Sequence, residues 1–284
     1  VASEFRYREP PIPDRTLALF VSQSGETADT LAALRYCEGK ADKIVSVINV
    51  PESSIARESD LALPIHAGVE VGVASTKAFT CQLTVLLMLV LKAARARGTI
   101  TEAEMAEHVA ALRNLPALMS HAIEQTDAMQ STARQLAEAR DILFLGRGVM
   151  FPLALEGALK LKEISYIHAE AYASGELKHG PLALIDNSVP VVVMAPRDAL
   201  FDKTVSNMQE VMARKGKVAL ISNKAGIKEA GMGTWAQIAM PDCPDVIAPI
   251  IYAVPAQLLA YHTAVAKGTD VDQPRNLAKS VTVE

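Results

Sequence analysis

The feature that most restricts the fold is a pattern that occurs twice along the 284 residues. In each copy an apolar strand is followed by a helix, a second strand, a short element, a third strand and a long apolar helix. The copies span residues 17–98 and 189–268. Strands that alternate with helices indicate parallel sheets, because a parallel connection needs a crossover. The pattern predicts an α/β protein with two doubly wound parallel sheets flanked by helices, with ligands at the carboxyl ends of the strands.

The expected elements follow from the period of the apolar residues. Between the two copies, residues 101–140 are predicted to be helical, with a capping box at Thr101 and Glu104 and a break at Pro116. We place the domain boundary in this helical stretch, which gives domains 1–123 and 124–284. The remaining expected strands are 16–21, 43–50, 61–65, 141–145, 189–195, 217–222 and 235–240, and the expected helices are 28–38, 53–59 (a helix or turn), 75–97, 155–166, 202–214 and 247–267.

The two copies are unequal. A further strand and helix, at residues 141–166, precede the second copy, whereas nothing comparable precedes the first. The chain also opens on Val1 rather than on Met. We therefore expect the first domain to be truncated at its amino end, so that its sheet exposes an unpaired edge and part of a core.

Composition excludes several classes of protein. Half of the residues are apolar, which allows a large core. The net charge of −4 argues against nucleic-acid binding. The cysteines, Cys37, Cys81 and Cys243, match neither a metal site nor a disulfide framework. The longest apolar run, residues 85–91, is shorter than the roughly 20 residues that cross a bilayer. We expect a cytoplasmic protein with no bound metal, cofactor or membrane.

The helix at residues 155–166 carries an unusual row of charges. Glu156, Lys160 and Glu163 recur at i, i+4 and i+7 and so share one stripe, which lies between apolar stripes. A polar loop, residues 175–181, follows and contains His179. Such a density of ionisable groups could form an acid–base site. By spacing alone, an ion-paired surface helix is the favoured interpretation.

A second candidate site follows the first strand, where residues 22–27 read SQSGET before a helix. The first turn of a helix offers unpaired N–H groups and the positive end of its dipole. The hydroxyls add donors, and Gly25 lets an anion approach the backbone. The loop lacks Lys and Arg, which suits a phosphate monoester held by neutral donors, and it lacks the pattern of a nucleotide loop. The alternative is an ordinary helix cap.

Residues 22–30, SQSGETADT, resemble the phosphate loop of the SIS (sugar isomerase) fold. Residues 72–79 (GVASTKAF), the block 155–185 and the tail 268–284 (GTDVDQPRNLAKSVTVE) are more specific. Together they resemble the isomerase half of the glucosamine-6-phosphate synthase family, the glutamine–fructose-6-phosphate aminotransferases. The similarity runs essentially from end to end. It implies two tandem SIS subdomains that convert fructose 6-phosphate and ammonia to glucosamine 6-phosphate.

The resemblance implies a role for each matching position. The 6-phosphate would be bound by Ser22, Gln23, Ser24 and Thr27, and the sugar hydroxyls by Val73, Ser75 and Ala278. Glu163 would move the proton between C1 and C2, with Lys160 setting charge and hydrogen bonding beside it. His179 would assist ring opening from the neighbouring subunit of a homodimer, and Lys279 would form an imine with the open-chain ketose.

These roles agree with the chemistry of the residues. A carboxylate can hold and return the proton, and an adjacent lysine favours its charged form. Lys279 attacks only when neutral, so we expect a desolvated site that lowers its pKa. The tail, residues 269–284, contains Leu277 and Val281, and we expect it to cover the site. Without the resemblance, Lys279 would be taken as a surface lysine and His179 as a loop histidine.

The sequence departs from the family in two respects. The glutaminase half, which supplies ammonia in the family, has no counterpart here, so we expect that this chain alone does not use glutamine. The opening strand and helix of the first domain and a Cys-Gly-Thr-Ser turn are also missing. Two alternatives stay open: a SIS enzyme that isomerises or deglycates a sugar phosphate without ammonia, and a sugar-phosphate sensor. A sensor has no use for Glu163, His179 and Lys279 together.

Overall fold

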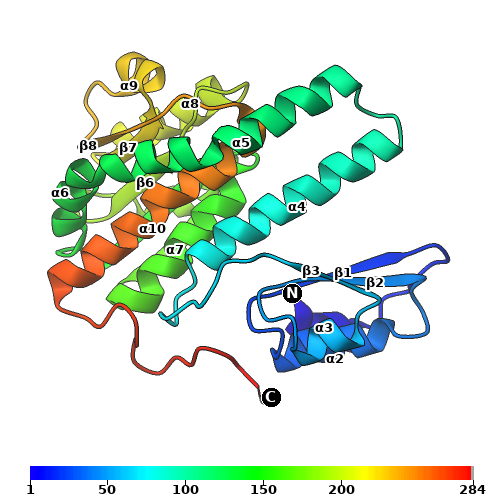
Figure 1. The fold of residues 1–284 in the computed structure, drawn as a ribbon. Coiled ribbons are helices and arrows are strands. Elements are labelled where there is room, and N and C mark those ends of the chain that lie inside the picture. Colours follow the sequence, from blue (N-terminus) through cyan, green and yellow to red (C-terminus); the bar gives the residue numbers. More distant parts are fainter. Residues whose placement is uncertain (283–284) are drawn as a thin grey trace. The chain divides into compact units, whose positions relative to one another are not determined.

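The computed structural model describes residues 1–282 and divides into two compact units. The first unit contains residues 1–101 together with the tail from residue 275, and the second contains residues 102–274 (Figure 1). The predicted division was 1–123 and 124–284, so the structure groups the helix after residue 101 with the second sheet and the end of the tail with the first. Residues 283 and 284 of the predicted tail lie outside the described residues.

The first unit is built on a parallel sheet in the order β1-β2-β3. On one face, Leu34, Ile48 and Ile55 form the core under α2 and α3, and on the other Val47, Ile65 and Ala78 pack beneath α4 (Figure 1). Helices therefore cover both faces, as in a doubly wound fold. The elements are α1 (Ala2–Phe5), η1 (Arg6–Arg8), β1 (Leu17–Ser22), α2 (Ala28–Cys37), β2 (Lys43–Ile48), α3 (Ser54–Glu58), β3 (Leu61–Pro64) and α4 (Lys77–Ala96).

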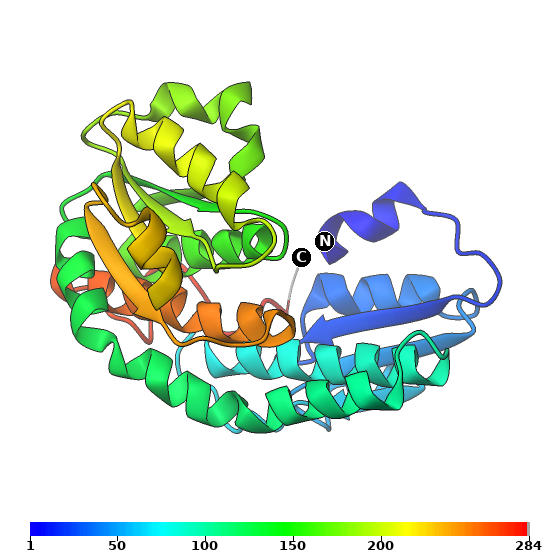
Figure 2. The same cartoon turned by 90° about the horizontal axis from the view of Figure 1, so that it is seen from above.

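The second unit has a five-stranded parallel sheet in the order β5-β4-β6-β7-β8. Helices α8 and α9 and η2 pack on one face, and α6, α7 and α10 on the other (Figure 2). The elements are α5 (Glu102–Glu124), α6 (Thr126–Leu136), β4 (Asp141–Gly146), α7 (Met150–Ser165), β5 (His168–Ala173), η2 (Ser174–His179), η3 (Pro181–Leu184), β6 (Pro190–Met194), α8 (Phe201–Met212), β7 (Lys217–Asn223), α9 (Lys224–Ala230), β8 (Ala236–Met240), η4 (Asp245–Ile247) and α10 (Ala248–Lys267).

The two sheets confirm the predicted repeat and its inequality. β1, β2 and β3 have the order and direction of β6, β7 and β8, and the second sheet adds β4 and β5 beyond β6. Within the described strands β1 pairs only with β2 and forms an edge. Its side chains Leu17, Leu19 and Val21 are 56%, 39% and 39% exposed. The expected exposed edge is therefore present in the first unit.

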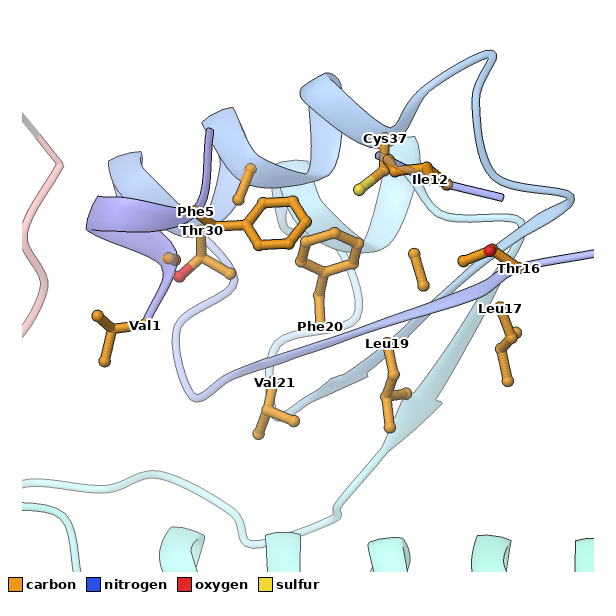
Figure 3. A pocket seen from close by; sticks show the side chains of 13 residues that line it. Val1, Phe5, Ile12, Thr16, Leu17, Leu19, Phe20, Val21, Thr30 and Cys37 are labelled. Atoms are coloured by element: carbon orange, nitrogen blue, oxygen red, sulfur yellow. The ribbon is translucent and has the colours of Figure 1, made fainter. Parts of the chain in front are cut away.

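An apolar hollow of about 510 Å³ runs along β1 (Figure 3). The rings of Phe5 and Phe20 face each other on the side of the strand that carries α2, whereas Leu19 points to the opposite side. Polar groups are scarce in its lining, where the hydroxyls come from Thr16 and Thr30. A sugar phosphate needs several polar partners, so this hollow is not the candidate substrate site.

Two predicted details of the helices and strands were wrong. Pro116 does not break the helix: α5 runs from Glu102 to Glu124 and the turn falls at Gln125 instead. Proline removes one backbone bond, but Pro116 is exposed, where water can bind the freed carbonyl, and buried Leu115 and Leu118 hold the helix on the core.

The strand β5 was missed. Its sequence, HAEAYA, has no apolar run, yet its polar residues alternate with alanines, and it pairs along its whole length with β4. A period of two was therefore available as the signal for a half-buried strand at the sheet edge.

Two helices are long and apolar enough to cross a membrane by length and composition alone. They are α4, with a mean hydropathy of 1.5, and residues 245–267, with 1.3. The second has 67% of its apolar window buried, where α10 packs against α6 and α7, as a core helix of a globular unit does. Both helices were predicted, at residues 75–97 and 247–267, but the longest uninterrupted apolar run, residues 85–91, gave no sign that either could span a membrane. The expected absence of a membrane stays a prediction.

Candidate active site

The loop between β1 and α2 is shaped by its own hydroxyl groups. The Gly25 amide donates to Ser22 Oγ (3.0 Å), the Glu26 amide donates to Ser24 Oγ (3.2 Å), and the Ser22 and Thr27 hydroxyls lie 3.3 Å apart. Gly25 has a φ of +67°, and a Cβ at this position would lie 1.9 Å from Ser53 Oγ. Only glycine fits this turn without strain. The predicted phosphate-binding residues thus form one compact loop at the carboxyl edge of the first sheet.

The remaining polar residues of the loop are anchored to neighbouring elements. Glu26 accepts a hydrogen bond from the Ser54 amide at the start of α3 (2.7 Å), and this bond lowers the pKa of Glu26. The Gln23 carbonyl accepts from the Asn49 amide at 3.2 Å. The carboxylate of Glu26 is therefore committed to α3, which leaves hydroxyls and amides as the groups that the loop offers to an anion.

The tail lies against this loop within the first unit. The Ser280 and Ser24 hydroxyls are 3.1 Å apart, and the Ala28 amide at the start of α2 donates to the Val281 carbonyl (3.0 Å). Residues 269–282 form neither helix nor strand, as predicted. Leu277 and Val281 remain 46% and 56% exposed, so polar contacts rather than apolar burial connect the tail to the loop.

A second loop, residues 66–76, contains Val73 and Ser75, and Ser75 contacts a buried carboxylate. Glu70 is 9% exposed and accepts hydrogen bonds from Ser75 Oγ (3.2 Å), the Thr76 amide and hydroxyl (3.1 and 3.2 Å) and the Ala78 amide (2.9 Å). Burial raises the pKa of Glu70, but the hydrogen bonds from Thr76 and Ala78 outweigh it, so the pKa lies below its ordinary value. Glu70 is therefore an anion that holds the loop at the start of α4.

Lys279 lies beside the same loop. Its Nζ donates to the Gly72 carbonyl, two residues from Glu70, and its charge helps to lower the pKa of Glu70. Lys279 and Ala278 are both exposed. The expectation of a desolvated lysine is therefore not met, because an exposed ammonium near a carboxylate and a carbonyl is favoured over the neutral amine. Glu70 was not predicted, because it belongs to no sequence motif and reaches Ser75, Thr76 and Ala78 only through the fold of the loop.

In the second unit, the charged row on α7 is largely buried. Lys160 is 5% exposed, and its Nζ lies 2.5 Å from a Glu163 oxygen and 3.8 Å from a Glu156 oxygen. The stripe predicted from spacing is confirmed, but the interpretation as a surface helix is wrong. Gly157 explains the burial: a Cβ there would meet the Phe144 ring of β4 at 2.9 Å, so the helix packs directly on the sheet.

Two carboxylates thus share one ammonium in a place with little water. Glu156 Oε1 is buried and has no hydrogen-bond partner within residues 1–282. Burial raises the pKa of Glu156 to about 7, with Lys160 opposing the shift and Glu163 adding to it. Near neutral pH Glu156 can therefore gain or lose a proton, as a group that transfers protons requires.

His179 ends η2 and is exposed. Its Nδ1 lies 2.6 Å from a Glu176 oxygen, and Gly180 follows with a φ of +143°. This contact satisfies one ring nitrogen and leaves the side chain at the surface of the unit.

The part of the chain that the structure describes holds no cluster of three or more His, Cys, Asp or Glu side chains that could bind a metal ion. Cys37, Cys81 and Cys243 are present as free thiols.

These features define a class of protein: parallel α/β units with a hydroxyl-rich loop at a strand end. The SIS domain family matches residues 1–92 and 135–267, and the chain belongs to this family. It is 61% identical over 283 residues to glutamine–fructose-6-phosphate aminotransferase [isomerizing] of Zymomonas mobilis, covering 100% of this chain and 47% of that protein. The Brucella abortus protein of the same name is 59% identical over 284 residues, with the same coverage. The resemblance found in the sequence is confirmed.

Solved structures give the same result. The carboxyl-terminal domain of glucosamine-fructose-6-phosphate aminotransferase from Francisella tularensis matches with a TM-score of 0.94 and 47% identity, over 96% of this chain and 77% of that one. Glucosamine-6-phosphate deaminase from Thermotoga maritima matches with a TM-score of 0.75 and 25% identity, over 99% and 80%. The chain spans about half the length of the curated relatives and corresponds to their isomerase half.

Proposed function

We propose that this chain is the module that converts fructose 6-phosphate and ammonia to glucosamine 6-phosphate and water. The observation that carries the proposal is the buried row Glu156, Lys160 and Glu163 in a chain that also has the Ser22–Thr27 loop. A sensor needs the loop alone, because binding involves no proton transfer. The names of the relatives that match the whole chain support the same reaction.

Substrate binding is assigned to the first unit. Ser22, Gln23, Ser24 and Thr27 bind the 6-phosphate through hydroxyls and amides, and the dipole of α2 favours the anion. The sugar hydroxyls are bound by Val73, Ser75 and Ala278. Support comes from the hydroxyl-lined turn at Gly25 and from the Glu70 bonds that order residues 75–78.

Nitrogen is introduced through Lys279. Its ammonium first loses a proton, and the neutral Nζ attacks C2 of the open-chain ketose. The C2 oxygen leaves as water and a carbon–nitrogen double bond forms. Ammonia then replaces the lysine nitrogen at C2, which releases Lys279. The net reaction removes one oxygen from C2 as water and adds one NH₃, so the atoms balance.

The remaining steps are proton transfers. Glu163 removes a proton from C1 and returns it to C2, while the C1 hydroxyl loses its proton and the imine nitrogen gains one. Together these transfers turn the C2 imine into an amine and C1 into an aldehyde. Lys160, 2.5 Å from Glu163, stabilises its carboxylate and the charge that develops on the substrate. His179 opens the sugar ring, and we assign it to the site of the partner subunit in a homodimer, because its side chain is exposed on its own unit.

The source of ammonia lies outside this chain. The relatives are about twice as long and are named as glutamine-dependent enzymes, so we assign ammonia supply to a glutaminase domain in the full-length protein. We further propose a cytoplasmic location and a reaction that needs neither metal nor cofactor, because lysine and carboxylate chemistry accounts for each step.

The second candidate is an isomerase or deglycase that acts on a sugar phosphate without ammonia transfer. The similarity to glucosamine-6-phosphate deaminase at 25% identity favours it as the alternative. It uses the same loop and the same Glu163 but does not depend on an imine at Lys279.

Borohydride reduction in the presence of fructose 6-phosphate separates the two. A covalent adduct at Lys279, found by peptide mass spectrometry, is expected for wild type and for the control Lys267→Met, and not for Lys279→Met. The same protein given ammonium chloride should form glucosamine 6-phosphate, whereas glutamine should give none. An isomerised sugar without any adduct would support the alternative, and neither product nor adduct would refute both.

A further inference from the structure

Glu70 is a buried carboxylate that has no chemical role in the proposed reaction. Its two oxygens accept four hydrogen bonds, from Ser75 Oγ, from the amide and hydroxyl of Thr76 and from the Ala78 amide. These bonds fix the stretch that links the loop to α4. The same loop carries Gly72, whose carbonyl accepts a hydrogen bond from Lys279 Nζ.

We infer that Glu70 is the positioning residue of Lys279: it fixes the loop whose Gly72 carbonyl binds the lysine, and it places a negative charge near the lysine. This inference rests on the proposed imine chemistry at Lys279. The carboxylate acts through the loop and through its charge and makes no bond to the substrate.

Two effects of Glu70 oppose each other. Ordering the loop brings Gly72 and Val73 into place and so favours sugar binding. The negative charge favours the ammonium form of Lys279 and so slows its attack. The balance suits an amine that should not react with stray carbonyl compounds in the absence of a phosphorylated ketose.

The other charged or titratable groups at this junction do not replace Glu70. Lys77 has the same sign as Lys279, and its Nζ donates to the Val69 carbonyl (2.5 Å). Cys81 on α4 is partly buried, and burial first and Glu70 second raise its pKa, which keeps it a neutral thiol. Of Glu70, Lys77 and Cys81, only Glu70 therefore carries a negative charge that can act on Lys279.

The charge effect can be measured without substrate by labelling amines with acetic anhydride at pH 7–10 and reading each lysine by mass spectrometry. The labelling rate of a lysine follows its neutral fraction. In Glu70→Gln the rate of Lys279 at pH 8.5 should rise about three- to tenfold, since an opposite charge is lost. The exposed reference Lys217 should not change, nor should Lys279 in the control Glu38→Gln, which removes the same charge at the far end of α2.

The positioning effect is measured separately. Thr76→Ala keeps the carboxylate but removes one of its hydrogen bonds, so the labelling rate of Lys279 should stay at the wild-type value while KM for fructose 6-phosphate rises. Glu70→Asp keeps the charge and should restore the slow labelling. An unchanged labelling profile in Glu70→Gln would overturn the inference.

A reciprocal measurement covers the case in which Glu70→Gln does not fold. In Lys279→Met, an exposed substitution, the NMR titration midpoint of the Glu70 carboxyl should rise, and an unmoved midpoint would also overturn the inference. Both readouts use the unliganded chain. If they succeed while borohydride traps no adduct, the proposed imine chemistry fails and the charge coupling stands.

Discussion

The strands β1 and β6 are the corresponding first strands of the two copies, yet the loops that follow them differ in kind. After β1, residues 22–27 offer hydroxyls around the αL turn at Gly25. After β6, residues 195–200 read APRDAL, where Asp198 accepts from the Leu200 amide (2.8 Å) and Arg197 pairs with Glu229. The polar side chains of the second loop thus bind within the loop itself and to α9. One scaffold thus carries a hydroxyl-rich loop in one copy and a turn with internally bonded polar groups in the other.

The carboxyl edge of the second sheet is closed as well. A hollow of only about 30 Å³ lies there, bordered by Arg197, Cys243 and Tyr252. It is large enough for roughly one water molecule and far too small for a sugar phosphate. Burial raises the pKa of Cys243 to about 11 and also raises that of Tyr252, so both side chains are neutral core groups. The hydroxyl-rich loop of the first unit therefore has no counterpart at this small hollow of the second sheet.

The second unit differs in where it places charge. Its helix α7 buries Lys160 between two carboxylates, whereas the loop of the first unit offers neutral donors. Fixed dipoles of hydroxyl and amide groups are sufficient to bind an anion. Proton transfer, in contrast, requires groups that can change their charge. The two units thus differ in the groups that they display: hydroxyl and amide donors in the first and paired charges in the second.

The largest expected effect is that of Glu163→Gln. If proton transfer belongs to α7, this substitution should lower the rate of product formation by about 10²- to 10⁴-fold with a small change in KM. Exchange of the C1 proton with deuterated solvent, followed by NMR, should fall by the same factor. The control Glu229→Gln, an exposed ion-pair partner, should be active. Retained exchange in Glu163→Gln would move the chemistry away from α7.

Gly25→Ala tests whether the turn between β1 and α2 tolerates a side chain at Gly25. The new methyl group would meet Ser53 Oγ and would also sit at positive φ, so the free energy of unfolding should fall by about 2–4 kcal/mol. Gly39→Ala is the matched control, because its φ is +69° and no atom lies within 4 Å of the added Cβ. It should lose about 1 kcal/mol, from the backbone alone. Equal losses in urea unfolding would show that the contact with Ser53 is irrelevant.

The paired substitution Ser24→Ala with Thr27→Val removes two hydroxyl donors from the loop. KM for fructose 6-phosphate should rise about 10- to 100-fold, at about 0.5–1.5 kcal/mol for each hydrogen bond. Reaction with unphosphorylated fructose, though slow, should be unaffected. Ser120→Ala on the exposed face of α5 is the control and should leave KM unchanged. An equal loss with both sugars would show that the loop does not bind phosphate.

Much of this organisation could be predicted from local sequence. Strand-and-helix alternation, the Ser22–Thr27 loop and the Glu156, Lys160, Glu163 stripe all depend on spacing within one element, and spacing is visible in a sequence. The burial of Lys160 is not, because it arises from the close packing of Gly157 on Phe144 of a different strand. The contacts of Glu70 with residues 75–78 and of Lys279 with Gly72 likewise arise from chain folding over five to more than two hundred residues.

The smallest effect is also the most specific to the second unit. Below about pH 4.5 the Glu156 carboxyl is protonated in both the folded and the unfolded chain, so it does not lower the free energy of unfolding. As the pH rises from 4.5 to about 7, the unfolded chain loses this proton while the folded chain keeps it, and the free energy of unfolding falls. Above pH 7 the cost is complete, at up to about 3 kcal/mol.

Glu156→Gln has no such proton. Measured by urea unfolding, its free energy of unfolding relative to wild type should therefore rise between pH 5 and pH 8 by about 1–3 kcal/mol. The substitution also removes one of the two carboxylates near Lys160, and the loss of this attraction reduces the increase. The exposed control Glu229→Gln should show a flat difference over the same range. A difference that falls with pH, or does not change, would mean that Glu156 is ionised in the folded chain, and the proton-carrying row of α7 would reduce to an ordinary pair between Lys160 and Glu163.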